Sequence, residues 1–312
     1  MIYTLTLNPA VDRELRVHSI SFGEVIRASG LRVDVGGKGF NVSRALRALD
    51  AESVALGFVG GHAGDLISEG LSRLGVATDF VRIAGGETRT NVSVVAPDRH
   101  LKVNEAGPEV TLDEERHLVE RVRALARRDD FWVLSGSLPP GATTGVYAAV
   151  IRIVQTAGAR AVLDTSGAAL AAGCRAGPFL VKPNAVEASE LTGLRVETPA
   201  QVRTAALAIQ SMGAAHVLVS LGRRGALLCN GPRAWVASPP PVEEQNPVGA
   251  GDAMVAGLVW SLSRGMALPE ALPWAVAAGA AAASLPGTAF GDADMVAALA
   301  RRVELSPLEP GP

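Results

Sequence analysis

The stretch "FWVLSGSLPPGATTGVYAAVIRIVQTAGARAVLDTS" (residues 131–166) contains two short apolar runs with a helical pattern between them. Continuous apolar runs of this length are typical of parallel strands that are buried on both faces. Similar runs occur in "SVALGFVG" (53–60), "FLVKPN" (179–184) and "HVLVSLG" (216–222), again with helical patterns between them. This alternation predicts an α/β fold, a three-layer α/β/α sandwich with helices on both faces of an open sheet.

Two segments do not follow this alternation of strands and helices. Residues 14–35 and 78–104 alternate polar and apolar side chains, as in "TNVSVV" (90–95). Such alternation is typical of an antiparallel sheet with one face in water, so we expect these segments to form a small β-sheet lid on the main body. The sequence contains no clear linker, and we therefore expect a single domain over residues 1–312.

The composition bears on the class of partner. The 312-residue chain has a formal net charge of −2, with 48% hydrophobic and 19% charged residues, so we expect no nucleic-acid surface. Residues 271–287 are rich in alanine but interrupted by prolines and glycines, which predicts a packed helix and no membrane partner. Cys174 and Cys229 lack the spacing of metal ligands, and we expect buried thiols and a cytoplasmic location.

Polar residues follow most of the predicted strands. In a parallel sheet these positions meet at the carboxyl edge, where open α/β proteins bind ligands. Each one alone is more often a turn residue or a helix cap, but their repetition favours a binding site at this edge. The residues concerned are Ser135, Ser137, Asp164, Lys182, Asn184, Ser220 and Gly222.

A candidate catalytic segment is "NPVGAGDAMVAG" (246–257). Gly249, Ala250 and Gly251 have little or no side chain, so their amides can approach a ligand at the positive end of the following helix. This arrangement could stabilise a transferring phosphoryl group, while Asp252 takes the proton of an attacking hydroxyl. The alternative, which spacing alone leaves open, is an acid that only interacts favourably with the helix dipole.

A second glycine-rich helix start is "DVGGKGFNVSRAL" (34–46). It lacks the GxxxxGK[ST] spacing of a P-loop. Its glycines, the cation of Lys38 and the amide of Asn41 suit a hydroxylated, anionic small molecule. A plain helix N-terminus is the alternative.

Five features in this order and spacing resemble those of the ribokinase-like (PfkB-type) carbohydrate kinases over nearly the whole chain. They are Asp12, "GGKGFN" (36–41), "SGSLPPG" (135–141), "KPNAVE" (182–187) and "VGAGD" (248–252). With "TLTLNPAVD" (4–12) and "TRTNV" (88–92), they are most similar to the bacterial phosphosugar branch, which holds 1-phosphofructokinase, tagatose-6-phosphate kinase and a 6-phosphofructokinase. The resemblance implies transfer of the γ-phosphate of MgATP to a ketohexose monophosphate, with fructose 1-phosphate favoured.

The resemblance also implies roles for individual residues. Asp252 would be the base, and the amides of Gly249, Ala250 and Gly251 would hold the transferred phosphate. Sugar hydroxyls would be bound by Asp12, Gly37 and Asn41, and the phosphate of the sugar by Lys38, Arg89, Ser137 and additionally Arg27. The nucleotide would be lined by Lys182, Ser220, Gly222, Gly225 and Gly279. Asn184 and Glu187 would orient magnesium, mainly through its waters, because Mg²⁺ keeps much of its hydration shell.

The chain departs from the family pattern at Pro247, where a Thr or Ser is usual before "VGAGD". The proline removes a hydroxyl and an amide donor, which could alter nucleotide or magnesium contacts. Two other functions stay open, a kinase for a free sugar or nucleoside and a non-catalytic sugar-phosphate sensor. Exposed lid strands often pair edge to edge, so we also expect a homodimer formed through the lid.

Overall fold

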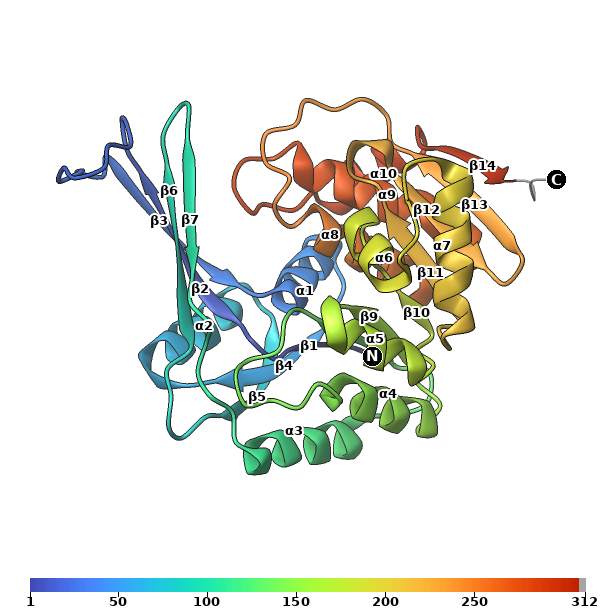
Figure 1. Ribbon diagram of the computed structural model, residues 1–312, viewed down its shortest axis with the longest axis horizontal. Coiled ribbons are helices and arrows are strands. Elements are labelled where there is room, and N and C mark those ends of the chain that lie inside the picture. Colours follow the sequence, from blue (N-terminus) through green and yellow to red (C-terminus); the bar gives the residue numbers. More distant parts are fainter. Residues whose placement is uncertain (309–312) are drawn as a thin grey trace.

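The computed structural model describes residues 1–308, and their strands form a large and a small sheet (Figure 1). The large sheet has ten strands in the order β14-β13-β12-β11-β10-β9-β8-β1-β4-β5. Its strands are β1 (Ile2–Thr6), β4 (Val54–Val59), β5 (Ala77–Arg82), β8 (Phe131–Ser135), β9 (Arg160–Asp164), β10 (Leu180–Val181), β11 (His216–Ser220), β12 (Ala226–Asn230), β13 (Arg233–Ser238) and β14 (Glu304–Leu308). The predicted strands near residues 53, 131, 160, 180 and 216 are confirmed.

The neighbouring strands β11-β10-β9-β8-β1-β4-β5 pair in parallel, as predicted. The strands β12, β13 and β14 extend the sheet in antiparallel fashion. This extension was not predicted. β12 and β13 are joined by a tight turn without a crossover helix, and β14 follows α10 and pairs antiparallel with β13, so none of the three belongs to a βαβ unit that the sequence pattern would show.

Helices cover both faces of the large sheet. One face carries α1 (Lys38–Ala48), α2 (Gly61–Arg73), α8 (Ala250–Ser263), α9 (Leu268–Ala283) and α10 (Ala293–Ala300). The other face carries α3 (Leu112–Leu125), α4 (Val146–Thr156), α5 (Gly167–Arg175), α6 (Ala185–Thr192) and α7 (Pro199–Ser211). Successive strand residues point to opposite faces, so Val133 joins the core beneath α8 while Trp132 and Leu134 join the other core. The predicted three-layer α/β/α sandwich is confirmed.

The alanine-rich stretch near the C-terminus forms most of α9, as predicted, and this helix packs tightly on α8. A Cβ atom at Gly257 of α8 would lie 2.7 Å from the carbonyl oxygen of Trp274 in α9, so the close approach needs glycine. Among residues 1–308, no helix has the length and apolar character needed to cross a membrane. Cys174 and Cys229 are buried free thiols, as predicted.

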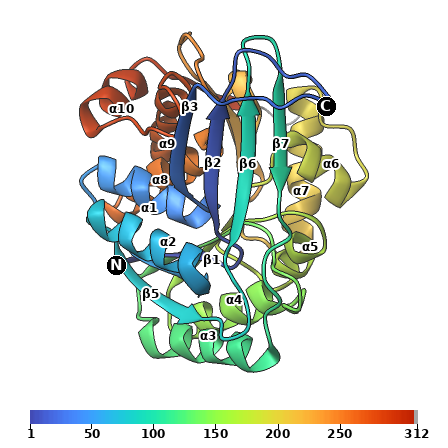
Figure 2. The same ribbon diagram turned by 90° about the vertical axis from the view of Figure 1, so that its left-hand side faces the viewer.

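The small sheet is the lid, and it stands away from the body on one side (Figures 1 and 2). Its order is β3-β2-β6-β7, formed by β2 (Ala10–Arg16), β3 (Gly30–Gly36), β6 (Arg89–Val95) and β7 (His100–Asn104). The β2–β6 pair is parallel and the other pairs are antiparallel, so the lid is a mixed sheet and not the purely antiparallel one expected.

The lid boundaries also differ from the predicted segments 14–35 and 78–104. The first part begins earlier, at Ala10, and the second begins at Arg89, because β5 pairs with β4 at the edge of the large sheet. As an edge strand, β5 contains only exposed and half-buried residues and no continuous apolar run, so the sequence did not distinguish it from a lid strand. Residues 309–312 of the predicted single domain lie outside the described part of the chain.

Candidate functional site

The polar residues that follow the parallel strands meet at one edge of the large sheet, together with the N-termini of α1, α6 and α8. Asp164 ends β9, Asn184 follows β10 and forms a bridge with Ser220 at the end of β11. Two cavities lie at this edge, a larger one of about 550 Å³ and a smaller one of about 220 Å³. Helix N-termini and polar strand ends at the same place favour an anionic ligand.

The proposed base lies in the first turn of α8. Gly249, the N-cap residue, has φ of 84°, a left-handed conformation that favours glycine, and the helix begins with Ala250. Asp252 is 6% exposed, and its Oδ2 accepts a hydrogen bond of 2.8 Å from Nδ2 of Asn41. The α8 N-terminus and a buried carboxylate are thus combined in one turn of helix.

Opposing effects set the pKa of the Asp252 carboxyl. Burial, with a smaller contribution from the negative charge of Asp164, raises this pKa to about 6, while Lys38, Asn41 and Lys182 act in the opposite direction. A carboxylate with a pKa near 6 is ionised at neutral pH and still accepts a proton readily, which suits a general base.

Asp164 is a site residue to which the sequence assigned no role of its own. Its Oδ1 accepts a hydrogen bond of 3.1 Å from Nζ of Lys38 and lies 3.3 Å from Nζ of Lys182. Burial alone would lower the pKa of the Lys38 ammonium, but the charges of Asp164 and Asp252 outweigh it and raise this pKa. A polar residue at a strand end was the only signal for Asp164, because Lys38 comes from a distant part of the chain and Lys182 from the next strand connection.

Lys182, predicted to contact the nucleotide, lies beneath the site rather than in the wall of either cavity. It is 4% exposed, and a Cβ atom at Gly251 would lie 3.6 Å from its Nζ. Its positive charge is therefore held close to the amides at the start of α8.

The smaller cavity brings together three residues predicted to bind the phosphate of the sugar, Lys38, Arg89 and Ser137. Its other lining residues are Thr6, Asn8, Gly37, Gly136, Thr165, Ser166 and Glu187. Arg89 donates from Nη1 to the carbonyl oxygen of Glu105 at 3.1 Å and from Nη2 to that of Asn8 at 2.9 Å. Its buried Nε has no partner among residues 1–308. Arg89 is thus fixed at the base of the lid instead of moving freely.

Two predicted sugar ligands and one predicted phosphate ligand do not line this cavity. Asp12 lies on lid strand β2, where its Oδ1 accepts a hydrogen bond of 2.8 Å from Asn91, and burial raises the pKa of its carboxyl. Asn41 donates to Asp252. Arg27 is exposed in the segment between β2 and β3. The roles predicted for these residues stay predictions.

The larger cavity is lined by four of the predicted nucleotide residues, Ser220, Gly222, Gly225 and Gly279. Apolar residues from α8 and α9, including Met254 and Val276, cover one side, and Ala250 and Gly251 lie at the other. Pro247 also lines the cavity, and its carbonyl oxygen accepts a hydrogen bond of 3.2 Å from the amide of Ala250. A cavity with an apolar wall and a helix N-terminus suits a flat base joined to phosphates.

Asn184 and Glu187 form a reciprocal cap at the start of α6. Asn184 Oδ1 accepts from the Glu187 amide at 2.9 Å, and Glu187 Oε2 accepts from the Asn184 amide at 2.8 Å. Asn184 borders the larger cavity and Glu187 the smaller one, so the cap lies between them. The cap uses one oxygen of each side chain, and Oε1 of Glu187 is left for a hydrated cation.

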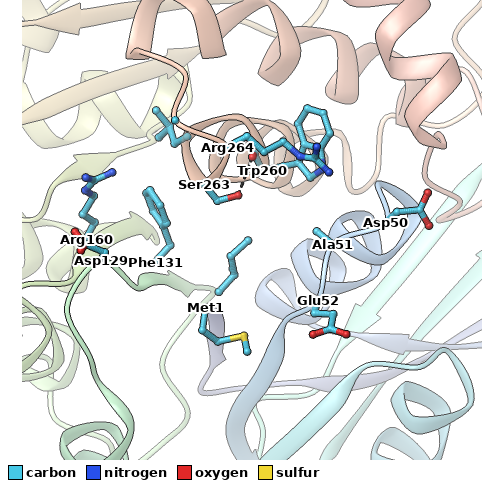
Figure 3. A pocket seen from close by; sticks show the side chains of 13 residues that line it. Met1, Asp50, Ala51, Glu52, Asp129, Phe131, Arg160, Trp260, Ser263 and Arg264 are labelled. Carbon is cyan, nitrogen blue, oxygen red and sulfur yellow. Dashed lines mark hydrogen bonds between the residues drawn. The ribbon is translucent and has the colours of Figure 1, made fainter.

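A further cavity of about 530 Å³ lies at the opposite end of the strands, and none of the predicted site residues lines it (Figure 3). Its arginines lie over neighbouring aromatic rings, Arg264 at 4.2 Å from the ring centroid of Trp260 and Arg160 at 5.2 Å from that of Phe131. This cavity is therefore no part of the predicted site.

Comparison with known proteins gives one consistent family. A model described as pfkB family carbohydrate kinase matches residues 4–294. The 1-phosphofructokinase of Bacillus subtilis is 36% identical over 91% of this chain and 92% of its own. That of Escherichia coli strain K12 is also 36% identical, over 98% of both chains. Two structures of phosphofructokinase-2 from Escherichia coli each have a TM-score of 0.89 and cover 96% of this chain and 98% of theirs. They are the tetrameric inhibited form, 34% identical, and the complex with fructose-6-phosphate, 33% identical.

The buried Asp252 should lower the stability of the protein above pH 6. Its folded-state pKa of about 6 exceeds the ordinary 3.8, so the free energy of unfolding falls as the pH rises from about 4 to about 6. A shift of about two units corresponds to roughly 3 kcal/mol. Asp252→Asn should therefore raise the free energy of unfolding at pH 8, measured by chemical denaturation, and much less at pH 4.

The matched control is Asp294→Asn, which changes an exposed acid in the first turn of α10. Its effect on the free energy of unfolding should be small and similar at both pH values. An equal effect of Asp252→Asn at pH 4 and pH 8 would show that the pKa of Asp252 is not raised.

Proposed function

The chain belongs to the pfkB family of carbohydrate kinases, and we propose that it transfers the γ-phosphate of ATP to a hydroxyl of a ketohexose monophosphate, with fructose 1-phosphate as its substrate. The observation that carries the proposal is the buried Asp252 at the start of α8, with cations around the smaller cavity nearby. In this arrangement Asp252 accepts the proton of the attacking hydroxyl. The amides of Gly249, Ala250 and Gly251 hold the transferred group.

The nucleotide is assigned to the larger cavity and the sugar phosphate to the smaller one. The apolar wall from α8 and α9 suits the adenine, and the N-terminus of α8 suits the phosphates. Pro247 lines this cavity in place of the usual Thr or Ser, so the nucleotide would meet no side-chain hydroxyl at this position. Lys182, which lies beneath the site, then contributes a positive charge near the amides at the start of α8.

The charge of the smaller cavity supports a substrate that is already phosphorylated. Lys38 and Arg89 line it, and Arg89 keeps a buried Nε without a partner in the described chain. Lys38 is already paired with Asp164, but a neutral sugar or nucleoside would leave Arg89 without an anionic partner, which costs binding energy. The names of the relatives favour fructose 1-phosphate, while fructose 6-phosphate and tagatose 6-phosphate are the alternatives.

Magnesium is the second cofactor of the proposal. The cap of α6 fixes Asn184 and Glu187 between the two cavities, where the phosphates of a nucleotide would meet the sugar. Oxygen ligands of this kind suit a hard cation that keeps several of its waters. Bound magnesium would neutralise phosphate charge, and the residues of the cap would orient its waters.

Steady-state kinetics with MgATP test the function. Fructose 1-phosphate should give the highest kcat/KM of the three ketohexose monophosphates, and free fructose should be worse by about 10³-fold or more, because it lacks two or three charge-assisted hydrogen bonds. Asp252→Asn should lower turnover by roughly 10² to 10⁴. Similar efficiencies for fructose 1-phosphate and fructose would contradict the phosphosugar assignment.

Arg89→Ala extends the same test to a single residue. It should raise the KM for the sugar phosphate far more than the KM for ATP. It should also reduce the difference in kcat/KM between fructose 1-phosphate and free fructose. Arg16→Ala, a change of an exposed arginine on the same lid, is the control and should leave both values unchanged.

Glu187→Gln should raise the Mg²⁺ concentration needed for half-maximal rate, because it removes a charge that orients the waters of the metal. The KM for the sugar should not change. Glu114→Gln is the control, because Glu114 makes the same reciprocal cap with Thr111 at the start of α3. An unchanged magnesium titration would leave Glu187 with a capping role only.

A homodimer formed through the lid is part of the proposal. Leu31 and Val33 on β3, and Leu101 and Val103 on β7, are at least 43% exposed. Such apolar side chains on a thin sheet favour association with a second copy. Sedimentation velocity should show a dimer, and Val33→Glu with Val103→Glu should shift it to a monomer. A wild-type monomer at micromolar concentration would contradict this part.

A further inference from the structure

Arg44, on α1, contacts both the lid and the site. It lies almost one turn after Asn41 and is half-buried. Nη1 donates to Oδ1 of Asn41 at 3.2 Å and to the carbonyl oxygen of Val35 at 3.4 Å. Nη2 donates to the carbonyl oxygen of Thr288 at 3.1 Å. The guanidinium therefore joins the end of lid strand β3, the segment after α9 and the side chain of Asn41.

These contacts determine which way the Asn41 amide points. An arginine can only donate hydrogen bonds, so the group of Asn41 that faces Arg44 must be the oxygen. The amide nitrogen then faces Asp252, whose ionised carboxylate can only accept, and donates to it at 2.8 Å. A rotated amide would place two oxygens against each other. We propose that Arg44 is a positioning residue, which holds Asn41 so that its amide orients the carboxylate of Asp252.

The lid takes part in holding Arg44. On β3, Arg32 Nη2 donates to the hydroxyl of Thr288 at 3.2 Å, and this hydroxyl donates to Oδ2 of Asp34 at 3.4 Å. Arg32 also pairs with Asp34 at 2.7 Å. A Cβ atom at Gly287 would collide with the Arg32 guanidinium, so glycine leaves room for this contact. A continuous series of hydrogen bonds thus runs from β3 through Thr288 and Arg44 towards the base.

Arg44 lines neither of the two site cavities, and its effect should therefore differ from that of a ligand-binding residue. The groups that face Asp252 directly are Lys38, Lys182 and Asp164, with Asn41 as the hydrogen-bond donor. Lys38, Lys182 and Asp164 remain in a variant of Arg44. A change in the pKa of Asp252 in such a variant therefore reports on Asn41.

The inference rests on the proposed function, since it takes Asp252 as the base. The test compares Arg44→Gln and Arg44→Lys with Arg47→Gln, a change of an exposed arginine one turn further along α1. Glutamine lacks the reach, and lysine the planar fork, to donate to Asn41 and Thr288 together. Both Arg44 variants should lower kcat by about tenfold, with both KM values within about twofold of wild type. The acid limb of kcat against pH should move to higher pH, and Arg47→Gln should match wild type.

Other outcomes overturn the proposal. Full kcat in Arg44→Lys would show that only the charge acts, and a lower Tm with normal kcat in both variants would show a purely structural role. If wild type turns over none of the three sugar phosphates, the proposed function fails, but positioning is still tested. The carboxyl of Asp252 can be titrated in the ligand-free protein by ¹³C NMR, with Asp252→Asn to assign its signal. A higher midpoint in Arg44→Gln supports the proposal, and an unchanged one overturns it.

Discussion

The carboxylate of Asp164, which is fully buried, contacts the ammonium groups of both Lys38 and Lys182 beneath the site. The buried ammonium of Lys182 would not be stable in the interior without it, because an unpaired buried charge costs several kcal/mol, whereas Lys38 is partly exposed at the smaller cavity. The carboxylate of Asp252 also acts on Lys38, so the two ammonium groups face two carboxylates. The cations of this edge are therefore held in place by a buried aspartate that comes from a strand end.

The same charges determine how Asp252 behaves. Burial and Asp164 favour its protonated form, while the two lysines and Asn41 favour the ionised form. The first turn of α8 thus combines amides that attract negative charge with a carboxylate that holds a proton less firmly than its burial alone would dictate. In the positioning role proposed for Arg44, the contacts between the lid and Thr288 would act on this balance from outside the cavities.

Patterns within short stretches of sequence predicted the elements whose formation depends on neighbouring residues. Strands buried on both faces are continuous apolar runs, and β4, β8, β9 and β11 could be located on that basis. The edge strand β5 lacks a continuous apolar run and was assigned to the wrong sheet, and the antiparallel strands β12, β13 and β14 do not follow the alternation of strand and helix. At the site, the glycines and Asp252 formed a recognisable group. The roles of Asp164 and Arg44 depend in part on partners far along the chain, Lys38 for Asp164 and Thr288 for Arg44, and their neighbourhood in the sequence does not show these contacts.

The central position of β1 matters for how the chain folds. β1 pairs with β4, which begins at residue 54, and with β8, which begins at residue 131. During synthesis the first pair can form long before the second, and one edge of the middle strand stays open while about 75 further residues are added. Open strand edges promote association between chains, and long-range parallel pairing is slow. The nascent chain therefore keeps one edge of β1 unpaired until β8 has been synthesised.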